Sequence, residues 1–305
     1  MSEKSAPIQQ IPELKPGKYS DGHPLDDVQY VESKIILKPE RFTSRMSFWD
    51  YARIVKRVAK EHDVGFTTEG YENERPQIRE VIFLDTADFR LYKGGFILRR
   101  RIRYEDGFPF GEPEIVFKYR IPDLQAAAEM DVRPRIEGDY RIKFKVEVLP
   151  PKDGPGGVRV LYSHNCEFPL GHMHEGQQTK MSVVSHTLPA LSKLHRPREE
   201  RLALVNHTIV EEVLQDIGTL DFGKGVTAKA NVALWRERGD HAPLVGEFAY
   251  QVKFKRRDEL ADKAIKRSEQ FFVSLQLASP DWILPGATKT GIVYRKQGNP
   301  PQSHE

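Results

Sequence analysis

Apolar and polar residues alternate along much of the chain, with the period of a β-strand that buries one face. The alternation is clearest at residues 141–148, where four charged residues are separated by Ile, Phe and Val. The pattern predicts strands at residues 29–37, 78–85, 95–104, 113–119, 140–149, 158–163, 227–236, 244–255 and 289–295.

A second pattern places apolar residues three and four positions apart, which is typical of helices that bury one face. It is most regular near residue 50, where Phe48, Tyr51 and Val55 fall on one stripe. Helices are predicted at residues 44–61, 199–217 and 257–277.

The chain has 305 residues, a length that one large β domain can account for. Residues 28–296 are predicted to form this single domain, with a loop-rich insertion at residues 150–197. Residues 1–27 and 297–305 are rich in Pro, Ser, Gln and charged residues, so they are expected to be disordered tails.

Several predicted strands carry charge on one face and apolar residues on the other. In the ordinary arrangement, the apolar face packs on the core and the charged face meets water. Two considerations favour another arrangement: the predicted helices also need apolar surface, and closing the sheet removes its exposed edges. The predicted fold class is therefore mainly β (α+β), a closed antiparallel β-barrel tunnel of about eight strands with amphipathic helices packed outside.

Closing the barrel turns the charged strand faces toward its lumen. The Leu-Arg-Arg-Arg-Ile-Arg run at residues 98–103 then places alternate arginines on one inward face. Ten basic positions would face four acidic ones, Glu32, Glu114, Glu147 and Glu247. Such a lumen would attract a polyphosphate. The basic positions are Lys34, Arg99, Arg101, Arg103, Lys118, Arg141, Lys143, Lys145, Lys253 and Lys255.

The composition of the chain limits which ligands and partners are expected. The net charge is only +3, so attraction of an anion must come from local clustering, and nucleic acid is not an expected partner. Carboxylates among the cations suggest a bound Mg²⁺ or Mn²⁺. The single cysteine, Cys166, and the lack of a long apolar run or a secretory signal predict a cytoplasmic protein without a membrane partner.

Four segments, in chain order, resemble the CYTH superfamily, the triphosphate tunnel metalloenzymes that include thiamine-triphosphatase-like and class IV adenylate-cyclase-like proteins. Residues 81–101 resemble the family's Y-x-D-T … L … G … L-R-x-R segment. Residues 115–118 resemble its T-L-K strand, residues 244–250 its late G-x-E-x-E strand, and residues 287–294 its closing S-K segment. The resemblance implies a β-tunnel that hydrolyses a triphosphate with a divalent metal ion.

The resemblance covers roughly residues 28–295 and implies roles for individual residues. Glu32 and Glu247 would hold the metal ion, Lys34 would stabilise the leaving phosphate, and Glu147 would be a further ligand of the metal ion or would orient water. The phosphates of the substrate would be bound by Arg99, Arg101, Lys118, Arg141, Lys143 and Lys289.

Two positions depart from the family's pattern. The opening E-x-E-x-K reads Tyr30-Val-Glu32-Ser-Lys34, and the late E-x-E reads Glu247-Phe-Ala249. Each carboxylate pair has lost one member, which weakens a site for a hard cation. The first hypothesis is a metal-dependent triphosphatase; the alternative is a non-catalytic protein that binds polyphosphate or a phosphorylated ligand. A nucleic-acid-binding β protein is the third and least favoured hypothesis.

Overall fold

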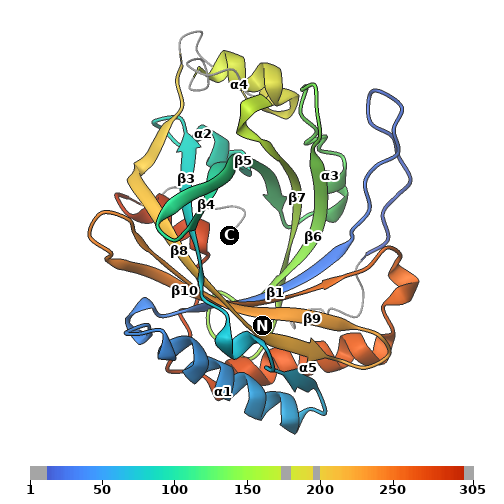
Figure 1. Cartoon of the computed structure of the whole chain (residues 1–305). Coiled ribbons are helices and arrows are strands. Elements are labelled where there is room, and N and C mark those ends of the chain that lie inside the picture. The colour runs from blue at the N-terminus through green and yellow to red at the C-terminus, as the bar shows by residue number, and fades with distance from the viewer. Residues whose placement is uncertain (1–11, 173–179, 195–199, 299–305) are drawn as a thin grey trace.

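Ten strands form one sheet that curls around on itself (Figure 1). The computed structural model describes residues 12–172, 180–194 and 200–298. In chain order the strands are β1 (Tyr30–Leu37), β2 (Gly65–Thr67), β3 (Gln77–Asp85), β4 (Phe96–Glu105), β5 (Phe108–Ile121), β6 (Arg141–Leu149), β7 (Arg159–Pro169), β8 (Ala203–Asp221), β9 (Thr227–Glu237) and β10 (Pro243–Lys253).

The sheet closes into a barrel. Its strand order is β2-β8-β3-β4-β5-β7-β6-β1-β10-β9, and β8 also pairs with β9. Nine strands therefore form the ring, and β2 extends the sheet beyond it. The pair β1 and β6 is parallel, whereas the other neighbours in the ring are antiparallel. The predicted closed barrel is confirmed, with nine strands in place of about eight and with one parallel pair.

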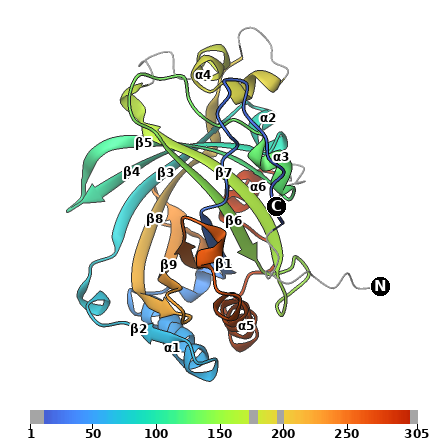
Figure 2. The same ribbon diagram turned by 90° about the vertical axis from the view of Figure 1, so that its right-hand side faces the viewer.

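The described helices pack against the ring, and several of them lie outside it, as predicted. They are α1 (Met46–Glu61), α2 (Arg90–Lys93), α3 (Leu124–Ala128), α4 (Met181–Thr187), α5 (Asp262–Ala278) and α6 (Lys289–Arg295). Figure 2 shows α1 and α5 below the barrel and α4 above it. None of the helices in the described ranges is both long and apolar enough to cross a membrane.

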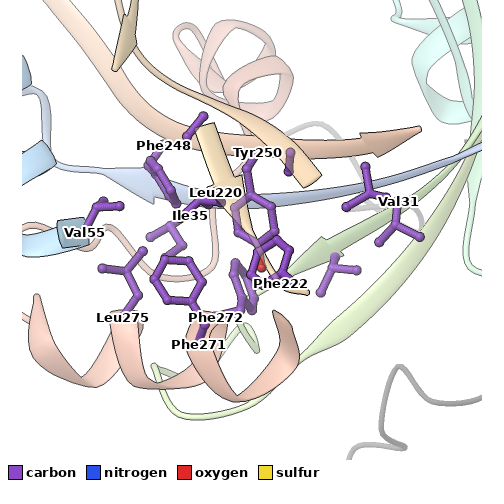
Figure 3. Close-up of a cluster of buried hydrophobic side chains, with 14 of the residues drawn as sticks. Val31, Ile35, Val55, Leu220, Phe222, Phe248, Tyr250, Phe271, Phe272 and Leu275 are labelled. Carbon is purple, nitrogen blue, oxygen red and sulfur yellow. The ribbon is translucent and has the colours of Figure 1, made fainter. Parts of the chain in front are cut away.

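The largest apolar cluster lies between the outer face of the ring and helices α1 and α5 (Figure 3). Ile35 and Phe248 face outward from β1 and β10 and meet Val55 of α1 and Leu275 of α5 in this cluster. Each such side chain contributes about 1.5–3 kcal/mol when it is fully buried. This burial fixes the apolar face of each strand outward, so the charged face must point into the lumen.

A second cluster covers the opposite wall of the barrel. Phe117 of β5 and Phe168 of β7 pack there with Met181 of α4 and Leu191. The two outer clusters therefore hold opposite walls of the same ring, and both leave the charged side chains of these strands on the inner face.

A third cluster bounds the lumen at one end. Ile36, Val81 and Trp235 point inward and line the cavity, and they share a buried cluster with Val293 and Tyr294 of α6. The prediction of a strand at residues 289–295 was wrong, because this segment forms α6. The side chain of Thr288 accepts a hydrogen bond from the Gly291 N–H at 3.0 Å and thereby caps the helix. The segment is too short for its apolar spacing to separate a strand from a helix.

The predicted helix at residues 199–217 was also wrong. Residues 203–221 form β8, which pairs with β3 on one side and β9 on the other; residue 199 lies outside the described residues. Val205, Ile209 and Val213 fit a helical stripe, but their β-branched side chains favour an extended strand between two partners.

The segment before β1 differs from the predicted tail. Residues 12–27 are described, and within them Lys18 and Pro24 form an antiparallel bridge. The Tyr19 hydroxyl donates to the Ala128 carbonyl at 3.0 Å, which ties this segment to α3. Residues 1–11 and 299–305 of the predicted tails lie outside the described residues.

The predicted loop-rich insertion at residues 150–197 also contains regular structure. It supplies β7, which extends to Pro169, beyond the predicted end of this strand at residue 163, and α4. Residues 173–179 and 195–199 are outside the described ranges.

Candidate functional site

The lumen of the barrel holds a polar cavity of about 210 Å³. Every strand of the ring contributes to its lining, and residues 288–290 reach it from the start of α6. The charged side chains that line it are Lys34, Arg79, Arg99, Arg101, Lys118, Arg120, Lys143, Lys145 and Lys289, against Glu32, Glu147, Glu167, Glu212 and Glu247. The excess of basic groups favours an anionic ligand.

Nine of the ten predicted site residues line this cavity: Glu32, Lys34, Arg99, Arg101, Lys118, Lys143, Glu147, Glu247 and Lys289. The tenth, Arg141, has a 60% exposed side chain and pairs with Glu167, so it lies at the mouth of the lumen. Lys289 reaches the lumen from a helix and not from the predicted strand. The structure thus brings the predicted residues together, while their individual roles stay predictions.

Glu147 is the carboxylate at the centre of the cations. Its side chain is fully buried, and its oxygens lie 2.9 Å from Lys118 Nζ and 3.2 Å from Lys34 Nζ. Arg120 Nη1 approaches the same carboxylate to 3.6 Å. Burial alone would raise the pKa of Glu147, but the three cations outweigh burial and hold this pKa well below its ordinary value. Glu147 is therefore ionised and balances part of the lumen's positive charge.

Lys118 is a basic group of the lumen whose pKa is strongly altered. Burial lowers the pKa of its ammonium to about 7, and repulsion from Lys34, Arg120 and Arg99 acts in the same direction. The negative charge of Glu147 opposes this shift without cancelling it. A second anion beside Lys118 would favour its charged form.

Glu32 is enclosed by two ammonium groups. Its oxygens lie 2.8 Å from Lys34 Nζ and 3.3 Å from Lys145 Nζ. Lys145 also donates to the Gln251 side-chain carbonyl at 2.8 Å. Burial would raise the pKa of Glu32, but Lys145 and Lys34 lower it far below its ordinary value.

Lys289 joins two further carboxylates at the closed end. Its Nζ lies 2.8 Å from Glu247 and 3.1 Å from Glu212. Glu212 also accepts from the indole N–H of Trp235 at 2.8 Å and faces Arg79 at 3.4 Å. Burial would raise the pKa of Glu212, but Lys289 and Arg79 lower it to about 2.

Two guanidinium groups in the lumen have unused donors. Nε of Arg99, and both Nε and Nη2 of Arg120, are buried without a hydrogen-bond partner among the described residues. Arg99 forms no ion pair in these parts of the chain either, and the only ion pair of Arg120 is the 3.6 Å contact with Glu147. Burial first, and then repulsion from Arg101, lowers the pKa of Arg99. Buried donors without acceptors are costly, and an anion in the cavity would supply the acceptors.

The sequence patterns missed four charged lining residues. Arg120 and Glu167 lie just beyond the predicted ends of their strands, and Glu212 lies in the segment mistaken for a helix. Arg79 shares its inward face with Val81 and Phe83, so its strand shows no uniformly charged face. Continued alternation past the predicted strand ends was the signal that could have found Arg120 and Glu167.

The carboxylates of the lumen are the only oxygen ligands among the predicted site residues for the divalent ion that the resemblance implies. Among the residues that the structure describes, no group of three His, Cys, Asp or Glu side chains is placed to hold a metal ion. Glu32 and Glu247, the predicted ligands, are each engaged by ammonium groups. Binding of Mg²⁺ or Mn²⁺ here stays a prediction, and this arrangement of donors does not favour it.

This chain is similar in structure to several solved proteins, at low sequence identity. No protein-family model and no curated protein matches the chain. HpAC1 from Hippeastrum, a candidate adenylyl cyclase described as having a dominant triphosphatase activity, is 11% identical with a TM-score of 0.41, over 91% of this chain and 100% of that one. PH1819 from Pyrococcus horikoshii is 13% identical with a TM-score of 0.36, over 88% of this chain and 99% of that one.

A candidate adenylate cyclase from Bacillus halodurans is 13% identical with a TM-score of 0.36, over 86% of this chain and 95% of that one. Identities and TM-scores this low say nothing about the chemistry of the site. The closed strand order and the charged lumen of this chain confirm the tunnel fold that the resemblance to the triphosphate tunnel metalloenzymes implied.

Proposed function

We propose that this protein binds a triphosphate, or a small molecule that carries one, in the lumen of its barrel. The observation that carries the proposal is the pair of buried guanidinium groups, Arg99 and Arg120, which line a cavity with excess positive charge and have donors without partners among the described residues. Phosphate oxygens are the acceptors that suit a guanidinium fork best, because two parallel hydrogen bonds can form.

The shape of the lumen supports a short ligand. The cavity is about 210 Å³, and the cluster around α6 bounds it at one end. A continuous polymer such as RNA needs a groove or a channel that it can follow, so the third hypothesis, nucleic-acid binding, is the least supported. A short chain of phosphoryl groups needs only one opening and a concentrated positive charge.

Hydrolysis of the bound triphosphate is a second candidate function. Glu147 Oε2 is buried beside Lys34 Nζ at 3.2 Å and Arg120 Nη1 at 3.6 Å, and no described residue donates a hydrogen bond to it. In this function Glu147 would orient the water, and Lys34, 3.2 Å from the same carboxylate, would stabilise the leaving phosphate.

The binding function is tested by Arg99→Lys, with tripolyphosphate affinity measured by calorimetry. Replacing the guanidinium removes a forked, charge-assisted contact worth about 1.5–3 kcal/mol, so the affinity should fall by roughly 10- to 100-fold. Arg100→Lys is the matched control, because Arg100 lies on the outer face of the same strand and pairs with Glu80 at 2.8 Å. Equal affinities in both variants and in the unmodified protein would refute the proposed site.

Binding should also take up a proton. The pKa of Lys118 is about 7 in the free lumen, and a polyanion beside it would raise this pKa. Binding should therefore be tightest below pH 7 and should weaken as the pH rises above 7. Calorimetry at pH 8 in buffers of different ionisation enthalpy should show an uptake of about one proton.

Lys118→Arg is the control for this proton uptake, because its guanidinium stays charged throughout this pH range. Protonation of the ligand itself contributes equally to the proton uptake of both proteins, so the difference between them reports Lys118. The same proton uptake in Lys118→Arg and in the unmodified protein would contradict a role for Lys118.

Hydrolysis is tested by release of inorganic phosphate from tripolyphosphate. Lys34→Gln should lower the rate of release by about 100-fold or more, because one buried charge next to the leaving group is lost. Arg100→Lys should leave the rate unchanged. A lack of release by the unmodified protein would remove this second function and leave binding alone.

A further inference from the structure

We propose that the lumen binds its polyanion without a divalent metal ion, because Lys145 and Lys289 occupy the two carboxylates that a metal ion would need. The inference rests on the proposed triphosphate-binding function and concerns how that same site achieves charge balance. Its ligand would be a free triphosphate and not a metal–triphosphate complex.

The first of these carboxylates is Glu32. Lys145 Nζ lies 3.3 Å from Glu32 Oε1, and Lys34 Nζ lies 2.8 Å from Oε2, so both oxygens are engaged. Lys145 is held in place by Gln251 at 2.8 Å and lies 5.7 Å from the centre of the Tyr30 ring. The parallel pairing of β1 and β6 sets Tyr30 directly beside Lys145. An aromatic face and an amide oxygen are suited to hold an ammonium group.

The second carboxylate is Glu247. Lys289 Nζ lies 2.8 Å from it and 3.1 Å from Glu212. Lys289 also lies 4.6 Å from the centre of the Trp235 ring. The residue two positions after Glu247 is Ala249, which lacks an oxygen ligand and pairs in register with Lys34. Lys289 is therefore enclosed by two carboxylates and an indole.

These contacts oppose a metal ion for a simple electrostatic reason. A divalent cation that approached Glu32 or Glu247 would meet an ammonium group about 3 Å from the same oxygens. It would have to displace that group or bear strong repulsion in a poorly hydrated cavity. Mg²⁺ also requires several oxygen ligands, and the carboxylates of the lumen are already engaged by ammonium groups.

The same ammonium groups can provide the charge neutralisation that a metal ion would provide. They neutralise the carboxylates that would repel phosphate, and the lining still has more basic than acidic side chains. Arg99 and Arg120 line the cavity, and neither guanidinium group has all its donors paired within the described residues. A metal-free triphosphate has its oxygens free for these donors, whereas bound Mg²⁺ would cover some of them.

The test is the affinity of the full chain for tripolyphosphate, measured by calorimetry in EDTA and then with excess Mg²⁺. We expect binding in EDTA, and equal or weaker binding with Mg²⁺, since Mg²⁺ sequesters the free ligand. Binding that appears only with Mg²⁺ would overturn this inference and leave the proposed function standing. Lack of binding in both conditions would overturn the proposed function and this inference with it.

A pair of variants assigns the effect to Lys145. Lys145→Gln frees one oxygen of Glu32, Oε1, while Lys34 still pairs with Oε2. The affinity in EDTA should fall by about 10-fold or more, and added Mg²⁺ should restore part of it. Lys253→Gln is the matched control, because Lys253 also lies near the Tyr30 ring, at 5.9 Å, but does not line the cavity as the sequence predicted. It is exposed and forms no ion pair within the described ranges. The two variants should share the thermal stability of the unmodified protein to within a few degrees. Equal metal-free affinities in the two variants would refute the role of Lys145.

Discussion

The whole lumen depends on the buried carboxylate of Glu147. Without a negative charge at that point, Lys34, Lys118 and Arg120 would repel one another in an environment that water screens poorly. The carboxylate balances only part of their charge, so the lumen is stable but remains electropositive. The outer apolar clusters make this possible, because they fix the inward direction of the charged strand faces.

Much of this arrangement could be predicted from sequence, because a strand has a period of two and its register is fixed by which face is buried. Once helices are given the apolar faces, residues such as Lys118, Lys143 and Glu147 must point inward, and they do. The errors came where local pattern is ambiguous. The β-branched stretch around Val210 fits a helical stripe as well as a strand, and only its pairing with β3 and β9 decides between them.

Other features of the site could not be predicted, because they depend on contacts between distant segments. Lys289 meets Glu212 across 77 positions of sequence, and no local pattern predicts that they share an ion pair. The sequence shows that Tyr30 and Ala249 stand where the family's pattern has Glu. It does not show what these replacements do to the site. Only the structure places Lys145 against Glu32 and leaves the donors of Arg99 without partners, which turns an incomplete metal site into a candidate site for a bare polyanion.

The most direct test of this account is a crystal structure of the protein with tripolyphosphate, grown without divalent metal ions. The account predicts the ligand inside the lumen, with phosphate oxygens within hydrogen-bonding distance of Arg99 and Arg120 and with Lys145 still on Glu32. A ligand found only outside the barrel, or one held in the lumen away from both guanidinium groups, would contradict it.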